Sequence, residues 1–426
     1  MELSPEYKRA RLIIIIAQCL GLFPYVLIND SPVIILYTSL LGCSEFVSIA
    51  TTAFLSMSRL VLTPVFAVVV DRVGKKRIMI PAFVVTGVCF AGLALAPLSG
   101  QHATGVVMGF LALTAIAIGI DHAGWFPLLK DIVPRQVRGN FFGVLRASWS
   151  SASMLFLFLI SLWAGRRATV PQLQLVIVAG GIMVLIKAGL ISLLPEKDTR
   201  TPGLKLGDVA RALLSQRELV SFCIYLFILY VLVGCTLPVT YVMAKTAFCL
   251  PDNYIINLTS LVMIANILGF ITGGIVNDRY GSKLIFLCAH FGFGLVCLLL
   301  LTVNAAAPAL YVRIALAFLV SAYGFLFSAS SIAVTTQLFA LARGTIQATA
   351  LAVGMAMYMG GSAFSRLGSG WLLDRGMLAK TWTLFSLPLT AYHTIFLLSG
   401  CGVIAAVILL TLVPSVMEKV QDYPKI

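Results

Sequence analysis

The chain has 426 residues, of which 60% are hydrophobic and only 11% are charged. About a quarter of the residues in a soluble domain are charged, so this composition excludes a soluble protein with one large core. The formal net charge of +14 bears on membrane orientation, because Lys and Arg collect in cytoplasmic loops. We therefore expect a bilayer around the chain and no nucleic-acid partner.

Long apolar runs follow one another along almost the whole chain. A helix that crosses a bilayer needs about 20 mostly apolar residues. The runs predict twelve transmembrane helices, at residues 12–36, 46–70, 78–98, 106–129, 140–164, 173–194, 219–243, 254–277, 284–303, 312–338, 345–371 and 391–413. No small-residue cleavage site follows the first run, so we expect that span to be retained.

The longest polar segment divides the twelve predicted spans into two sets of six. It covers residues 195–218 and is rich in charge, Pro and Gly at its start, as is typical of linkers. We predict an N-terminal six-helix bundle at 1–194, a cytoplasmic linker at 195–218 and a C-terminal six-helix bundle at 219–426. Most of the 30 Lys and Arg fall in the tails and loops on the same side of the membrane as the N-terminus. This bias predicts that both termini are cytoplasmic.

A charged turn with the spacing D-R-x-G-x-K occurs after the second span and again after the eighth. The residues are Asp71, Arg72, Gly74, Lys75 and Lys76 in the first copy, and Asp278, Arg279, Gly281 and Lys283 in the second. Arg138-Gly139 after the fourth span also recurs, as Arg343-Gly344 after the tenth, at nearly the same offset. Two landmarks at one offset predict a duplication. The expected fold is an all-α membrane protein of two pseudo-symmetric six-helix bundles, a known transporter architecture.

These landmarks resemble the major facilitator superfamily over the whole chain. The family's signature after the second helix is G-x-x-x-D-R-x-G-R/K-R/K. The first copy has Ala67 where the first glycine is usual, whereas the second copy keeps Gly274. The resemblance implies secondary transport by alternating access, without a cofactor, in which both turns act as gating elements. Gly74 would permit the tight reversal; the alternative is a basic cytoplasmic loop with no gating role.

Ionisable groups inside predicted spans are costly, so they are candidates for the pathway of a solute or ion. Arg59 lies near the middle of the second span, Asp121 and His122 lie on the fourth, and Arg146 lies on the fifth. Asp121 and Arg146 are at similar depth, and we expect them to form an ion pair, structural or in contact with substrate; the alternative is that Arg146 snorkels to the cytoplasmic headgroups. Asp30, in the outer third of the first span, either carries a coupling proton or lies in an outer vestibule.

Three other ionisable groups have structural interpretations. Lys187 on the sixth span is expected to snorkel to the interface, and His290 on the ninth to be packed between helices. Arg366 on the eleventh reaches either the interface or the cavity. The nine cysteines form no CxxC or Cys/His cluster, so neither a metal site nor a disulfide framework is predicted.

Cavity arginines favour an anionic solute, because guanidinium binds carboxylate or phosphate through a fork of hydrogen bonds. The leading hypothesis is a secondary active transporter of a small polar, anionic solute, with His122 and the carboxylates available for proton symport. Alternatives are a sugar or polyol transporter, a drug efflux pump, a non-transporting sensor or an intramembrane enzyme. An enzyme is not expected, because the four histidines are scattered. We expect a monomer in a bacterial inner (plasma) membrane.

Overall fold

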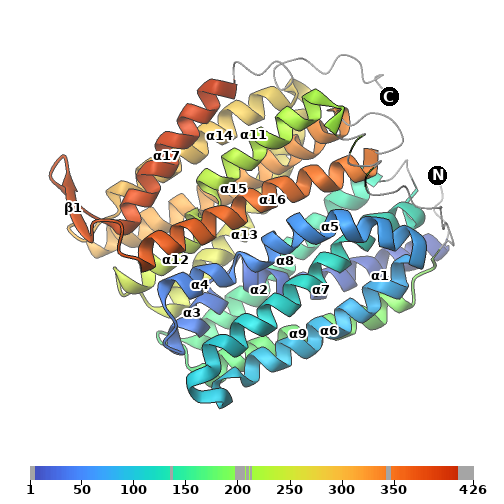
Figure 1. Ribbon diagram of the computed structural model, residues 1–426, viewed down its shortest axis with the longest axis horizontal. Coiled ribbons are helices and arrows are strands. Elements are labelled where there is room, and N and C mark those ends of the chain that lie inside the picture. The colour runs from blue at the N-terminus through green and yellow to red at the C-terminus, as the bar shows by residue number, and fades with distance from the viewer. Residues whose placement is uncertain are drawn as a thin grey trace. The chain divides into compact units, whose positions relative to one another are not determined.

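The computed structural model describes residues 5–134, 138–196, 214–341 and 347–410, together with residues 207 and 211. These residues are almost entirely helical (Figure 1). They contain nine helical stretches that are long and apolar enough to cross a membrane, or ten if one bent pair is counted as a span. One stretch, Lys75–Leu129, contains two consecutive helices. The prediction of an all-α membrane protein is confirmed.

The chain forms two compact units. Unit 1 consists of Met1–Leu206 and Leu250–Ser260, and unit 2 consists of Gly207–Cys249 and Leu261–Ile426. Most of the predicted linker at 195–218 lies outside the described residues, so the predicted domain limits stay a prediction.

The helices of unit 1 surround one apolar core. They are α1 (Pro5–Gly21), α2 (Phe23–Asn29), α3 (Val33–Leu40), α4 (Glu45–Thr51), α5 (Phe54–Val73), α6 (Lys75–Leu95), η1 (Ala96–His102), α7 (Ala103–Ile132), α8 (Arg138–Ala164) and α9 (Val170–Ser192). Helix α6 packs on α7 and α9, α5 packs on α7, and α1 packs on α8 and α9. Ile14, Met79, Phe83 and Trp125 belong to the core between α1, α6, α7 and α9.

The first predicted span is not one helix. Residues 12–36 are divided among α1, α2 and α3, with Pro24 in the first turn of α2 and Pro32 at the N-cap of α3. Proline has no backbone N–H and is tolerated at the start of a helix, whereas inside one it breaks the hydrogen-bond ladder. The expected continuous helix was therefore wrong, and the breaks occur where the two prolines begin new helices.

Unit 2 contains the remaining elements. They are α11 (Arg217–Val233), α12 (Thr236–Thr246), most of α13 (Asp252–Tyr280), α14 (Ser282–Leu299), η3 (Leu300–Thr302), α15 (Ala309–Leu341), α16 (Gln347–Asp374), β1 (Thr381–Leu384), β2 (Leu387–Thr390) and α17 (Ala391–Leu410). Helix α11 packs on α16 and α17, and α14 packs on α15 and α17. The predicted span 219–243 is broken between α11 and α12, and the hairpin β1–β2 was not predicted.

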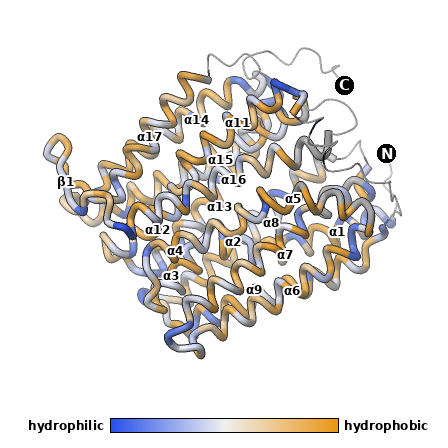
Figure 2. Tube along the Cα trace, in the orientation of Figure 1, coloured by the Kyte–Doolittle hydropathy of each residue, from blue (hydrophilic) through white to orange (hydrophobic). Residues whose placement is uncertain are grey.

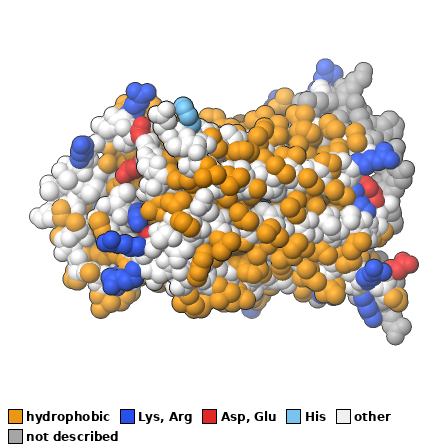
Figure 3. All heavy atoms as spheres, turned by 90° about the horizontal axis from the view of Figure 1, so that it is seen from below, with side chains coloured by type: hydrophobic (Ala, Val, Ile, Leu, Met, Phe, Trp, Pro, Cys, Tyr) orange, Lys and Arg blue, Asp and Glu red, His pale blue; other side chains and the backbone are white. Residues whose placement is uncertain are grey.

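The surface of unit 1 matches a bilayer. Exposed apolar side chains line α6 and α9, including Val85, Val88, Leu175 and Ile182. Figure 2 shows apolar residues along the helices and hydrophilic residues mainly toward their ends. On the face drawn in Figure 3, hydrophobic side chains cover the middle, whereas Lys, Arg, Asp and Glu gather toward the two ends. This is the distribution that lipid tails and headgroups require.

Two adjacent glycines of α13 allow a matched test of helix packing in unit 2. A Cβ at Gly273 would lie 2.7 Å from the backbone Cα of Ala329 on α15, whereas a Cβ at Gly274 would meet nothing within 4 Å. We expect Gly273→Ala to lower stability by about 1–3 kcal/mol through overpacking, and Gly274→Ala to leave it unchanged. Thermal unfolding of the two purified variants in detergent measures the difference; equal melting temperatures would contradict this packing.

Candidate functional site

A buried pocket in unit 1 collects most of the ionisable groups predicted to matter. Its polar lining comes from α1, α2, α5, α6, α7 and α9 and consists of Gln18, Tyr25, Arg59, Thr86, Asp121, His122 and Lys187. Phe83, Trp125 and Val184 of the core form part of its wall. The free volume within it is about 20 Å³.

Arg59 is anchored on one side of the pocket. Its guanidinium carbon lies 4.3 Å from the centre of the Tyr25 ring, and its Nη1 donates to the Tyr25 hydroxyl at 3.2 Å. Its Nη2 lies 3.2 Å from Nδ1 of His122. Because arginine is always protonated and can only donate, His122 accepts this hydrogen bond through a deprotonated Nδ1. Arg59 is only 6% exposed, and its predicted role in binding a solute stays a prediction.

Lys187 and Asp121 form an ion pair on the other side of the same pocket. Lys187 Nζ lies 3.2 Å from Asp121 Oδ2, 4.3 Å from the centre of the Phe83 ring and 5.2 Å from that of Trp125. A cation over an aromatic face is stabilised by the ring quadrupole. The second carboxylate oxygen of Asp121 is buried and accepts no hydrogen bond from the residues that the structure describes.

This pair corrects two sequence predictions. Asp121 was expected to pair with Arg146, but its partner is Lys187. Lys187 was expected to snorkel, but it is 3% exposed and lines the pocket. Gly21 of α1 makes room for it, because a Cβ there would overlap the lysine side chain.

Arg146 and Asp30 do not line the pocket. Arg146 is half-buried on α8. Asp30 is the C-cap residue of α2 and accepts a hydrogen bond from the Asn29 amide. Their predicted roles in binding and coupling therefore stay predictions, without support from the position of either side chain.

The first charged turn connects α5 and α6 through Gly74, which has φ of 110° and ψ of 143°. This left-handed φ is one that L side chains rarely adopt. The side chains of Asp71 and Arg72 lie outside the described residues, so their predicted gating roles stay predictions.

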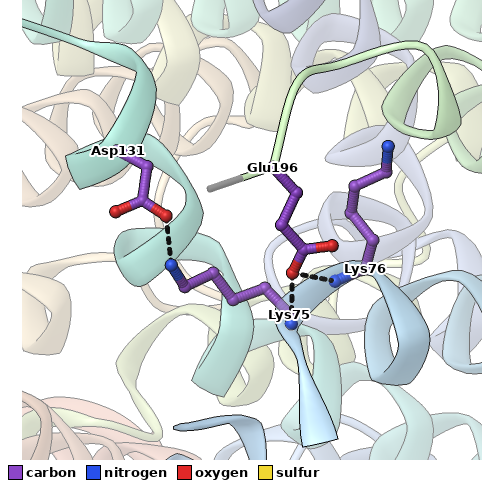
Figure 4. Close-up of polar contacts among 4 residues, drawn as sticks. All are labelled: Lys75, Lys76, Asp131 and Glu196. Carbon is purple, nitrogen blue, oxygen red and sulfur yellow. Dashed lines mark hydrogen bonds and ion pairs between the residues drawn. The ribbon is translucent and has the colours of Figure 1, made fainter. Parts of the chain in front are cut away.

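A carboxylate caps the helix that follows this turn. Glu196 Oε1 accepts from the backbone N–H groups of Lys75 at 2.6 Å and Lys76 at 3.2 Å (Figure 4). Negative charge at a helix N-terminus is favourable because unpaired N–H groups and the helix dipole meet there. Lys75 Nζ forms an ion pair with Asp131 of α7. The turn thereby joins the ends of α6, α7 and α9.

The second charged turn has the same backbone but a different environment. Gly281 joins α13 to α14 with φ of 79°. Asp278, Arg279 and Lys283 are all exposed, and the Arg279 guanidinium carbon lies 5.3 Å from the centre of the Tyr280 ring. The duplication of the turn therefore extends to its glycine, whereas the carboxylate cap of the first copy has no counterpart among the described contacts of the second.

Two other ionisable groups in unit 2 hold helices together. His290 lies 2.6 Å from the Tyr225 hydroxyl and 2.8 Å from Ser330 Oγ, so both ring nitrogens are used and the interpretation as a packed histidine fits. Arg366 Nε donates to the Gly234 carbonyl at 3.2 Å, at the break between α11 and α12. Among the described residues, no group of three or more His, Cys, Asp or Glu is placed to hold a metal ion.

The comparison with protein families decides the identity of the fold. The sequence model of the Major Facilitator Superfamily matches residues 14–348. The chain belongs to this superfamily. The family places it among membrane transporters and not among enzymes. No curated protein sequence matches the chain.

Solved transporter structures share this superfamily fold over nearly the full chain. A mutant of the nucleoside transporter NupG is 14% identical, with a TM-score of 0.72 and coverage of 96% of this chain and 99% of that one. A POT family transporter in complex with 5-aminolevulinic acid is 11% identical, with a TM-score of 0.74 and coverage of 96% and 97%. The xylose transporter XylE from E. coli is 14% identical, with a TM-score of 0.69 and coverage of 96% and 98%. At these identities the likeness concerns the fold alone.

The ion pair in the transporter's pocket generates a stability prediction. Lys187→Met leaves the buried Asp121 carboxylate without its cation, which is expected to lower stability by about 3–5 kcal/mol. The double variant Asp121→Asn/Lys187→Met removes both charges, so we expect it to recover most of that loss. Thermal unfolding of Lys187→Met, Asp121→Asn and the double variant in one detergent gives the coupling free energy between the two side chains. A double variant whose loss of stability equals the sum of the two single losses would contradict the ion pair.

Proposed function

We propose that this superfamily member is a secondary active transporter that moves a small, anionic, polar solute by alternating access, driven by protons. The observation that carries the proposal is the composition of the pocket in unit 1. Arg59 and Lys187 line it on two sides, whereas Asp121 is the one carboxylate among its lining residues. With His122 neutral, as its hydrogen bond from Arg59 requires, these groups sum to one positive charge.

A positive pocket inside the membrane favours an anion. Charges within the bilayer are costly unless they are paired. The free energy of removing two charges from water is offset best when the two groups form well-aligned hydrogen bonds. A carboxylate or phosphate at the pocket would accept from the guanidinium fork of Arg59, which binds such groups through two parallel hydrogen bonds. Tyr25 already holds that guanidinium in place, so little side-chain entropy remains to be lost on binding.

The pair Asp121–Lys187 supplies a route for proton coupling. A proton on Asp121 would remove its attraction for Lys187, and the freed ammonium group would then attract the anionic solute. Asp121 already has one buried oxygen without a hydrogen bond. In this mechanism, proton binding precedes solute binding, and the solute takes the place of the carboxylate as the partner of Lys187.

Uptake into sealed proteoliposomes under an imposed proton gradient tests the solute class. We expect uptake of an acid from a panel of acids, sugars and amines. Arg59→Lys keeps the charge but loses the fork, and hydrogen bonds to charged groups are worth about 1.5–3 kcal/mol, so uptake is expected to fall about tenfold or more. Arg313→Lys, an exposed residue of α15, is the control. Normal acid uptake by Arg59→Lys would overturn the anion site, and uptake of a sugar alone would favour the sugar-transporter alternative.

Asp121→Asn tests the coupling separately from binding. Asparagine is neutral at every pH, so the variant is expected to exchange labelled for unlabelled solute while losing accumulation driven by the proton gradient. Counterflow and gradient-driven uptake, measured on the same vesicle preparation, separate the two activities. If Asp121→Asn still accumulates solute in proportion to the gradient, the proton is carried by another group.

A further inference from the structure

The hairpin between α16 and α17 ends in a strained aromatic tip. Strands β1 and β2 are antiparallel and joined by the two residues Phe385 and Ser386. Both have positive φ, 47° and 68°. Two-residue hairpin turns with this backbone usually contain Asn or Gly, and positive φ at a bulky residue is a genuine outlier. Phe385 is nevertheless 91% exposed, so no contact with the part of the chain that the structure describes explains an aromatic side chain there.

The hairpin has one apolar face and one polar face. The register pairs Trp382 with Leu389 and Leu384 with Leu387. These side chains share one face, because residues opposite each other in neighbouring strands point to the same side. The other face carries Thr381, paired with Thr390, and Thr383, paired with Pro388. A hairpin built in this way separates an apolar from an aqueous environment.

The base of the hairpin is fixed to unit 2. The backbone N–H of Thr390 donates to Nδ1 of His393 at 3.0 Å, and Nε2 of the same buried ring donates to the Val303 carbonyl at 2.8 Å. Trp382 Nε1 donates to the Thr390 carbonyl at 3.3 Å. Figure 1 shows the hairpin standing clear of the helices of unit 2. The hydrogen bonds at the base therefore hold the tip of the hairpin away from the helices of unit 2.

The hairpin also lies at the level where a span enters the membrane. The candidate span Ala391–Leu409 begins directly after β2, and its Leu398 is 58% exposed, as expected of a lipid-facing side chain. A four-residue strand extends about 13 Å, so the tip remains close to the end of that span. The exposed side chains of Arg375 and Lys380 lie in the segment that leads into β1. Their charges complement phosphate headgroups.

We propose that the β1–β2 hairpin is a membrane-interface anchor. It places Phe385 and the apolar side chains beside it, Leu384 and Leu387, in the boundary between headgroups and acyl chains, in the leaflet where α17 begins, whereas Leu389 at the base of the hairpin is buried in the protein. Aromatic side chains favour this boundary, and an apolar face buried there is typical of elements that lie on a bilayer without crossing it. The polar face, with Thr383, remains in water. This role is independent of the proposed solute and coupling ion.

Two matched tryptophan variants test the anchor in the full-length protein. Phe385→Trp places a reporter at the tip, and Thr383→Trp places one on the polar face; each is compared with the parent chain in vesicles of phosphatidylcholine and phosphatidylglycerol. We expect the added emission of Phe385→Trp to be blue-shifted and quenched by lipids brominated near the top of the acyl chain. The added emission of Thr383→Trp should remain red and at most half as strongly quenched.

Three outcomes would overturn the anchor. Equal quenching of the two variants would mean that the hairpin does not distinguish lipid from water. Red, unquenched emission at position 385 would place the tip in water. Blue-shifted emission that lipid does not quench would mean that a protein covers the tip. As a second measurement, Arg375→Gln/Lys380→Gln in the Phe385→Trp background should reduce quenching by brominated phosphatidylglycerol more than quenching by brominated phosphatidylcholine. An equal reduction would exclude recognition of headgroup charge.

Discussion

The ion pair between Lys187 and Asp121 is the constraint around which unit 1 is arranged. A charge in the membrane interior must be paired or wet, and here each partner is brought to the other by a different helix, α9 and α7. The lysine stem passes the position where α1 has Gly21 and no side chain. Phe83 of α6 and Trp125 of α7 flank the ammonium group. The four helices α1, α6, α7 and α9 thereby all contribute to the surroundings of this one pair of charges.

The sequence located most of the pocket because ionisable residues in apolar runs are rare and expensive. Arg59, Asp121 and His122 were found in this way, and all three line the pocket. Lys187 was misjudged because the resemblance to the superfamily implies that the helix carrying it lies outside the cavity. A signal was present around the helix: Gly180, Val184, Lys187 and Ala188 share the buried face, whereas Leu185 and Ile186 are exposed. In a lipid environment, the face with small residues packs inward.

The sequence predicted where the membrane spans lie, but it did not predict where the helices within a span are interrupted. Hydropathy measures the mean character of a window, so it identified the runs but joined α1, α2 and α3 into one helix. Pro24 and Pro32 indicate the breaks locally, yet a proline is also tolerated inside membrane helices when neighbours satisfy the freed groups. The β1–β2 hairpin escaped prediction for another reason. Its turn, Phe385-Ser386, has none of the residues that usually permit positive φ.

The order of residues on α7 links the two cations of the pocket. Asp121 holds Lys187 of α9, and the next residue, His122, accepts a hydrogen bond from Arg59 of α5. Consecutive helical residues point about 100° apart, so one helix faces both cations without bringing them together. In the proposed mechanism, a proton on Asp121 would remove the carboxylate partner of Lys187, and a proton on Nδ1 of His122 would remove one acceptor of Arg59, which keeps its contacts with Tyr25. Helix α7 is therefore the element at which proton occupancy and anion binding would meet.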